Sequence, residues 1–231
     1  MFEFDDGFSD LAKIKVAYIG NLSNFIDVSI NGVEFISIDN KSNDEVNEAL
    51  KGADVVFIVA GKRTETVAAL SKEIGALTIA IVDSDNLSNS AVDTFFIIDS
   101  VQKSVIPNVI KAIADLIAVP GLVNLDFADV KSVLGNSGRG YVGTGEAVGK
   151  NAIVNAVKEA IINVGDISKS RSLMLNILGS VDSLSMMEVN EASITLQESV
   201  HEDAEIIWGV SVDESFGDKI RATLIATNLA D

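Results

Sequence analysis

Short apolar runs alternate with amphipathic stretches through the first half of the chain. Continuous or nearly continuous apolar runs predict buried strands, and a 3.6-residue apolar period predicts helices. The predicted strands are Ile14–Ile19, Val33–Ile38, Val55–Val59, Leu77–Val82 and Thr94–Ile98, and the predicted helices are Asn43–Lys51, Thr64–Ile74 and Val101–Val119. Because strands that alternate with helices form βαβ units, this half is expected to be a parallel α/β sheet.

The second half has fewer, longer elements. A helix FADVKSVL is expected to start after Asp126. Further on, the pattern predicts helices over 146–163 and 185–198, and strands over 171–178, 205–212 and 219–227. The last two strands flank Asp213–Asp218, which we interpret as a hairpin or a loop because it contains Gly217.

The stretch Ala118–Lys131, AVPGLVNLDFADVK, separates the two halves. Pro120 is expected to end the first helix, since proline lacks an N–H and disfavours a helical residue before it. Asp126 is then a good N-cap for the next helix, with Asp129 at the N3 position, where the helix dipole favours a carboxylate. The alternative is functional: Asn124, Asp126 and Asp129 would present acceptors to a site and polarise a water molecule.

Composition and charge exclude several classes of function. The chain has 231 residues and a net charge of −17, so neither nucleic acid nor anionic membrane is expected as a partner. It contains no cysteine, which excludes disulfides and thiolate metal sites, and we expect no metal centre. The start, MFEFDDGFSD, is not a signal peptide, and no apolar run reaches the roughly 18–20 residues of a membrane span. The expected location is the cytoplasm.

The segment PGLVNLDFADVKSV resembles the loop after the central helix of FtsZ, the bacterial tubulin-like division GTPase. Asn124, Asp126 and Asp129 match the N-x-D-x-x-D pattern of that family residue for residue. Further segments resemble the family in order along the chain: MFEFDD…IKV, NEALKGADVVFIVAG, KEIGALTIAIV, YVGTGEAVGKN and IIWGVSVDESFGDKIRATLIAT.

This resemblance implies a tubulin/FtsZ-like α/β fold with a parallel-sheet N-terminal domain and an α+β C-terminal domain. We expect a reduced nucleotide-binding-type domain at 1–100, the central helix at 101–119 and the C-terminal domain at 120–231. In the family the acidic loop enters the nucleotide pocket of the next subunit. The resemblance therefore implies that Asn124, Asp126 and Asp129 act catalytically in trans, on a neighbouring subunit.

The loops that bind nucleotide in the family are altered here. Phosphate-cradling loops need glycine so that backbone N–H groups can approach the ligand closely. In the first loop, IGNLSN, Asn21, Leu22 and Ser23 stand where the family has glycine. In the second, AGKRTETV, Glu65 places a carboxylate where polyphosphate would lie. The matching remnants are Gly20, Asn24, Gly61, Thr64 and Thr66. The ribose-binding pair of the family has no counterpart in Asp83–Ser90.

These differences favour a pseudo-GTPase without a cofactor, which contacts FtsZ or FtsZ-like subunits through its acidic loop and modulates or caps their assembly. The Lys62–Arg63 pair is expected to be a solvated surface, although it could contact phosphate. Two alternatives remain. One is a divergent, self-polymerising GTPase that uses GTP and Mg²⁺. The other is a scaffold with an unrelated small ligand at the carboxyl ends of the strands, where open α/β sheets bind ligands.

Overall fold

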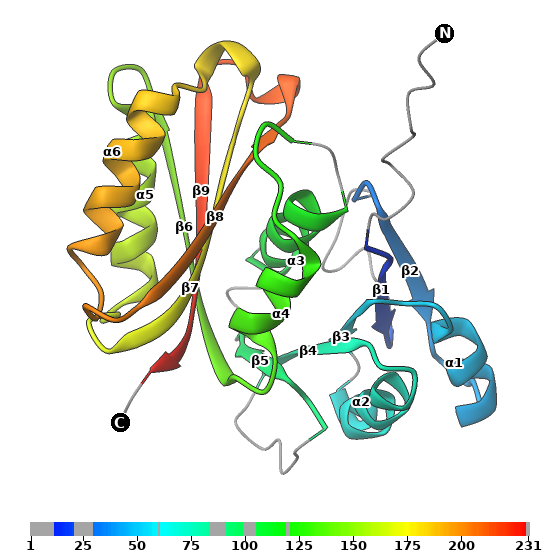
Figure 1. The fold of residues 1–231 in the computed structure, drawn as a ribbon. Helices are drawn as coiled ribbons and strands as arrows, with labels where there is room; N and C mark the ends of the chain where they lie inside the picture. The colour runs from blue at the N-terminus through cyan, green and yellow to red at the C-terminus, as the bar shows by residue number, and fades with distance from the viewer. Residues whose placement is uncertain are drawn as a thin grey trace, which may run out of the picture.

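The computed structural model describes residues 12–20, 30–59, 61–83, 91–98, 105–118 and 121–229. Its first half is a parallel sheet in the order β2-β1-β3-β4-β5 (Figure 1). The strands are β1 (Ile14–Tyr18), β2 (Val33–Ser37), β3 (Val55–Val59), β4 (Leu77–Val82) and β5 (Thr94–Ile97). Each lies within one residue of the predicted run, which confirms the parallel α/β interpretation.

Two helices follow strands of this sheet. Helix α1 (Asn43–Leu50) begins with a capping box, in which the Ser42 hydroxyl accepts from the N–H of Glu45 and the Glu45 carboxylate accepts from the N–H of Ser42. Helix α2 (Thr64–Glu73) follows a single 3₁₀ turn, η2 (Gly61–Arg63). Both helices agree with the predicted ranges to within one residue.

The central helix α3 (Val105–Ile117) packs against both halves of the molecule (Figure 1). Its apolar residues share one core with β1 and β3 and also with Met174 and Ile225 of the second half. The predicted range, Val101–Val119, extends at both ends into residues outside the described part of the chain. Pro120, which was expected to end this helix, also lies outside the described residues. A short helix, α4 (Phe127–Leu134), follows in the chain (Figure 1), and its buried residues belong to the same core as those of α3.

The second half extends the same sheet through a long strand. Strand β6 (Gly138–Val148) pairs in parallel with β5 over Gly138–Gly140 and antiparallel with β9 (Lys219–Leu229) over Tyr141–Val148. The order then continues β9-β7-β8, with β7 (Ser170–Gly179) and β8 (Glu205–Val212) parallel to each other. Helices α5 (Ala152–Val164) and α6 (Met186–Gln197) lie together over this part of the sheet (Figure 1).

One expectation about the second half was wrong, and one open alternative is decided by the structure. The helix predicted over 146–163 begins only at Ala152, because 146–148 complete β6. Of the two alternatives for Asp213–Asp218, the structure shows the loop: it holds a 3₁₀ turn, η4 (Glu214–Phe216), and β9 enters the sheet between β6 and β7, away from β8. A hairpin would pair β9 with β8, whereas the observed antiparallel pairing of β9 with β6 and β7 satisfies the hydrogen-bonding groups on both of its edges.

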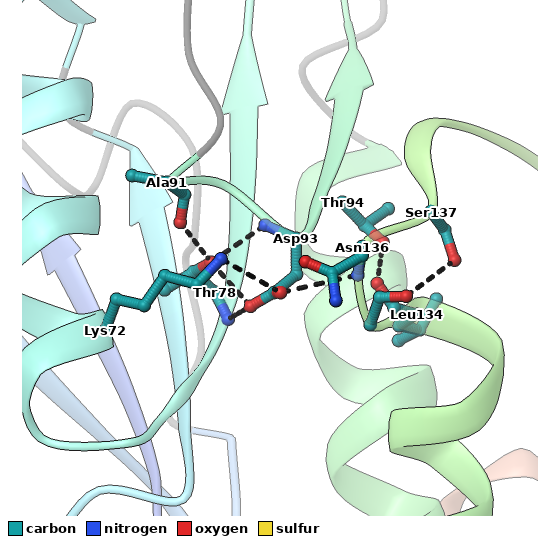
Figure 2. A network of polar contacts seen from close by, with 9 residues as sticks. Lys72, Thr78, Ala91, Asp93, Thr94, Leu134, Asn136 and Ser137 are labelled. Atoms are coloured by element: carbon teal, nitrogen blue, oxygen red, sulfur yellow. Dashed lines mark hydrogen bonds and ion pairs between the residues drawn. The ribbon is translucent and has the colours of Figure 1, made fainter.

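A buried carboxylate joins the two halves at the start of β5 (Figure 2). The Asp93 side chain accepts hydrogen bonds from the N–H (2.9 Å) and the hydroxyl (2.8 Å) of Thr78 in β4. It also accepts from the N–H of Asn136 (3.3 Å) in the turn before β6, and Lys72 lies 3.7 Å away. The Asp93 carbonyl accepts from the N–H of Gly138. One side chain thus fixes β4, β5 and β6 relative to one another.

Within the residues that the structure describes, no helix is both long and apolar enough to cross a membrane.

Candidate functional site

The acidic loop, residues 121–129, is fastened to both halves of the molecule by backbone hydrogen bonds. Leu122 and Val123 donate their N–H groups to the carbonyl of Val210 in β8 (2.9 and 3.2 Å), and Val210 donates back to Val123 (3.0 Å). Leu125 donates to the carbonyl of Leu116 in α3 (3.1 Å). The loop therefore has a defined position relative to the central helix and the β8 strand.

Gly121 is required by the close approach of this loop to β8. A Cβ at this position would lie 2.6 Å from the carbonyl oxygen of Val210 and 2.9 Å from the side-chain oxygen of Asn124. The same Asn124 oxygen accepts a hydrogen bond from the N–H of Gly121 (2.7 Å). Asn124 is exposed, but its oxygen serves to hold the turn.

Asp126 is the N-cap of α4, as the sequence predicts. It has extended backbone geometry (φ −68°, ψ 141°), and its carboxylate accepts from the N–H of Ala128 at 2.9 Å. Asp129 lies in the first turn, at the expected N3 position, and is exposed. Its carboxylate accepts no hydrogen bond from the described residues. Asp126 thus uses one carboxylate oxygen for the cap, whereas both oxygens of Asp129 remain available for a partner.

The carboxyl end of α3, which precedes the acidic loop, lies beside the amino ends of β1 and β2. The N–H of Ala12 donates to the carbonyl of Ile117 (3.3 Å), and Gly32, just before β2, is so close that a Cβ would lie 3.0 Å from that of Ala118. Because β1, β2 and β3 are parallel, their carboxyl ends lie at the opposite edge of the sheet. The end of α3 that leads to the acidic loop and the residues Gly20 and Gly61, which follow β1 and β3, thus lie at opposite edges of the parallel sheet.

The carboxyl edge brings together residues that follow the first three strands. Gly20 follows β1, Asp39 follows β2 and Gly61 follows β3. The N–H of Gly20 donates to the Asp39 carboxylate at 2.9 Å, and the Ser37 hydroxyl donates to the same oxygen at 3.1 Å. Gly20 and Gly61 both have positive φ, at 87° and 51°, a conformation that glycine adopts without strain. Asn24 and the altered positions 21–23 lie outside the described residues.

Thr64 and Thr66 differ in exposure at the start of α2. Thr64 is 1% exposed, and its hydroxyl has no hydrogen-bond partner among the described residues. Thr66 is half-buried. An unpaired buried hydroxyl costs free energy, so the Thr64 hydroxyl is a group that a ligand could satisfy.

The guanidinium of Arg63 is bound within the chain. One of its nitrogens, Nη1, donates to the carbonyls of Ile38 and Lys41, both at 2.9 Å, and Nη2 donates to the side-chain oxygen of Asn43 at 3.2 Å. Arg63 is therefore not a purely solvated side chain, because it is half-buried and holds residues 38–43. Lys62 is exposed, which agrees with the solvated alternative for that position.

Comparison with known proteins identifies the fold. Residues 138–230 match the C-terminal domain of the FtsZ family. An FtsZ dimer from M. jannaschii, described as empty, superposes with a TM-score of 0.81 at 24% identity, covering 94% of this chain and 88% of that chain. The chain has the FtsZ/tubulin-like fold. An FtsZ mutant from M. jannaschii gives a TM-score of 0.83 at 23% identity, covering 95% of this chain and 92% of that chain. A GTPγS-bound CetZ2 protofilament from Haloferax volcanii gives 0.65 at 13% identity, covering 95% and 94%.

In this FtsZ-like chain, a polar seam lies where α3 meets the second half. Lys111 contacts Asp115, four residues along α3 (3.1 Å), and Asp213 in the β8–β9 connection (3.8 Å). Burial raises the pKa of the Asp115 carboxyl, and the Lys111 ammonium offsets part of that rise. The pKa of Asp213 is lowered, chiefly by the hydrogen bond from the Ser215 hydroxyl. In this seam, burial therefore disfavours the ionised form of Asp115, whereas hydrogen bonds stabilise the ionised form of Asp213.

The sequence did not reveal the roles of Asp39 and Arg63. Asp39 and Gly20 are 19 positions apart, and Arg63 reaches carbonyls 22 and 25 positions away. Such contacts leave no local pattern. The one signal is topological: residues that directly follow neighbouring parallel strands meet at one edge.

Proposed function

We propose that this FtsZ-like protein docks its acidic loop onto the nucleotide-binding face of a neighbouring FtsZ-type subunit and so modulates or caps a filament. The observation that carries the proposal is the unequal state of its two ends. At one end Asp129 is exposed and accepts no hydrogen bond from the described residues. At the other, Gly20 and Arg63 are already occupied by groups of the same chain.

Two of the three polar side chains of the loop fix its backbone conformation, and the third supplies a carboxylate for the reaction. Asn124 and Asp126 hold the backbone, through Gly121 and Ala128. Asp129 then supplies a carboxylate that could orient a water molecule toward a phosphate on the neighbouring subunit, as a water-positioning residue does in phosphoryl transfer. The loop's rigid attachment to α3 and β8 keeps that carboxylate in place, and such pre-organisation lowers the cost of binding.

A filament of FtsZ-type subunits is polar, so a subunit that offers only one end stops growth. The similar solved structures include a dimer and a protofilament, which supports contact between subunits of this fold. With its own carboxyl edge occupied, this chain would present no nucleotide for the next acidic loop. It would therefore add to one filament end and prevent further addition there.

Sedimentation of a polymerising FtsZ with GTP tests this proposal. The wild-type chain is expected to appear in the pellet in a small amount relative to FtsZ, and to reduce the total amount of FtsZ polymer that sediments. Asp129→Asn should abolish both effects, because the loop keeps its shape but loses the available charge. Asp44→Asn is a matched control, since Asp44 is also an exposed acid in the first turn of an eight-residue helix.

Asp126 separates loop shape from charge. Asparagine caps a helix about as well as aspartate, so Asp126→Asn removes the charge alone, whereas Asp126→Ala removes the cap as well. If Asp129→Asn and Asp126→Ala both left the sedimentation of FtsZ unchanged from that with wild type, docking through this loop would be refuted.

One observation favours a second function, a divergent GTPase that assembles with itself. The hydroxyl of Thr64 is buried without a partner at the start of α2, and a Cβ at Gly61 would meet nothing within 4 Å. Both features suit the approach of a phosphate to a helix N-terminus. Nucleotide-dependent sedimentation of the chain by itself, without FtsZ, would establish this function in place of the first.

A further inference from the structure

The topology marks one place on the sheet where a ligand would enter. Strand β1 lies between β2 and β3, so the strand order reverses at β1: the next strand along the chain, β2, pairs with one edge of β1, and the following strand, β3, pairs with its other edge. Open α/β sheets bind ligands at such a reversal, outside the carboxyl ends of the strands. In this chain that place is bounded by Gly20 after β1 and Gly61 after β3.

A carboxylate of the chain already occupies the donor at this place. The N–H of Gly20 is a backbone donor of the kind that an anionic oxygen accepts from, and the Asp39 carboxylate takes it at 2.9 Å. The Ser37 hydroxyl donates to the same Asp39 oxygen. Any anion that approached Gly20 would have to displace this carboxylate and would meet its negative charge.

Arg63 holds the segment that carries Asp39. Its guanidinium bridges the carbonyls of Ile38 and Lys41, on either side of Asp39, and reaches Asn43 at the start of α1. The turn is completed by Asn40 in a left-handed conformation (φ 57°). Residues 38–43 therefore form a strap that is fastened at Gly20 on one side and at Arg63 on the other.

We propose that this strap is a built-in block of an anion site, in which the Asp39 carboxylate takes the position of a phosphate group. The inference deepens the proposed function and rests on its occupied end. The Asp39 contact satisfies the Gly20 N–H and places a negative charge beside it, and the Arg63 contacts hold the segment that carries Asp39 in place. The ligand class that the strap excludes is a phosphate or polyphosphate.

Titration calorimetry with inorganic pyrophosphate tests the block in the full chain. Asp39→Ala is expected to bind pyrophosphate at least tenfold more tightly than wild type, because it frees the Gly20 N–H and removes the repelling charge. Asp44→Ala is the matched control. It removes one exposed acid from the neighbouring helix without touching Gly20, and should bind pyrophosphate as weakly as wild type.

Equal pyrophosphate affinity of wild type and Asp39→Ala would overturn the proposal, and so would an equal gain in Asp44→Ala, which would indicate net charge alone. If the alanine variant does not fold, Asp39→Asn keeps the size of the side chain and should still show a gain of several-fold. This readout is independent of filament docking. If wild type fails to co-sediment with FtsZ but Asp39→Ala binds pyrophosphate more tightly than wild type, the proposed function alone is refuted. If wild type co-sediments with FtsZ but Asp39→Ala shows no gain in pyrophosphate affinity, the strap alone is refuted.

Discussion

Replacing Asp93 with alanine removes the carboxylate that joins β4, β5 and the turn before β6 (Figure 2). Asp93 is 7% exposed and Thr78 is fully buried, so water does not replace the lost acceptor. The Thr78 hydroxyl can keep its other acceptor, the carbonyl of Ala91 (2.9 Å), which limits the loss there. The Thr78 N–H has no such substitute.

The magnitude follows from these contacts. A hydrogen bond to a charged group contributes about 1.5–3 kcal/mol, and a buried donor left without a partner costs about 1–3 kcal/mol. The longer bond from Asn136 and the 3.7 Å ion pair with half-exposed Lys72 add less. We therefore expect Asp93→Ala to lower the free energy of unfolding by about 3–4 kcal/mol.

Urea denaturation followed by circular dichroism measures this loss. Asp54→Ala is a suitable control. Asp54 likewise lies just before a strand, but it is half-buried, and among the described residues its carboxylate accepts one hydrogen bond, from the N–H of Lys13. Its loss should cost about 1 kcal/mol. If the two variants lost the same free energy of unfolding, or if Asp93→Ala lost less than about 1 kcal/mol, the connecting role of Asp93 would be wrong.

Three further predictions concern stability. Asp126→Ala should lower the free energy of unfolding by about 1 kcal/mol, because it removes the cap of α4, while Asp129→Ala should change it by less than about 0.5 kcal/mol. Equal losses of the two variants in urea denaturation would contradict the assignment of Asp126 as the cap. Gly145→Ala should cost about 3 kcal/mol or more, because its Cβ would lie 2.1 Å from the carbonyl oxygen of Ala156 in α5, and a thermal melt within about 2 °C of wild type would count against that packing. Burial raises the pKa of Asp115, so the folded state binds the proton more tightly than the unfolded state, and wild type loses stability as pH rises from the ordinary value of 3.8 through the raised pKa. Asp115→Asn has no carboxyl to ionise, so its free energy of unfolding relative to wild type should increase from acidic to neutral pH. If urea denaturation gave the same difference between the two proteins at every pH, the raised pKa of Asp115 would be refuted as the cause.

Local patterns predicted much of the fold and part of the loop. The apolar runs of β3, β4 and β8 gave the observed bounds, since buried strands need continuous apolar surface. Asp126 was identifiable as a cap because capping depends on a few neighbouring residues. The match of the acidic loop to the family pattern places Asp129, but its catalytic role in trans stays a prediction.

Elements whose form depends on distant partners were not predictable in the same way. Strand β6, GRGYVGTGEAV, contains four glycines, and its sequence does not predict a strand because glycine has a low strand propensity. The structure explains two of them, because Gly143 and Gly145 lie against the backbone of α5, where a Cβ would come within 2.3 and 2.1 Å of carbonyl oxygens. The Asp39–Gly20 contact likewise exists only once β1 and β2 are side by side.

The central claim is that this FtsZ-like chain offers an acidic loop without holding nucleotide of its own. Titration of the full chain with a fluorescent GTP analogue in the presence of Mg²⁺ tests it most directly. The account predicts no saturable binding up to near-millimolar nucleotide, because the strap at Asp39 occupies the carboxyl edge. Saturable binding at micromolar concentration would contradict the account and would establish a nucleotide-binding, self-assembling subunit.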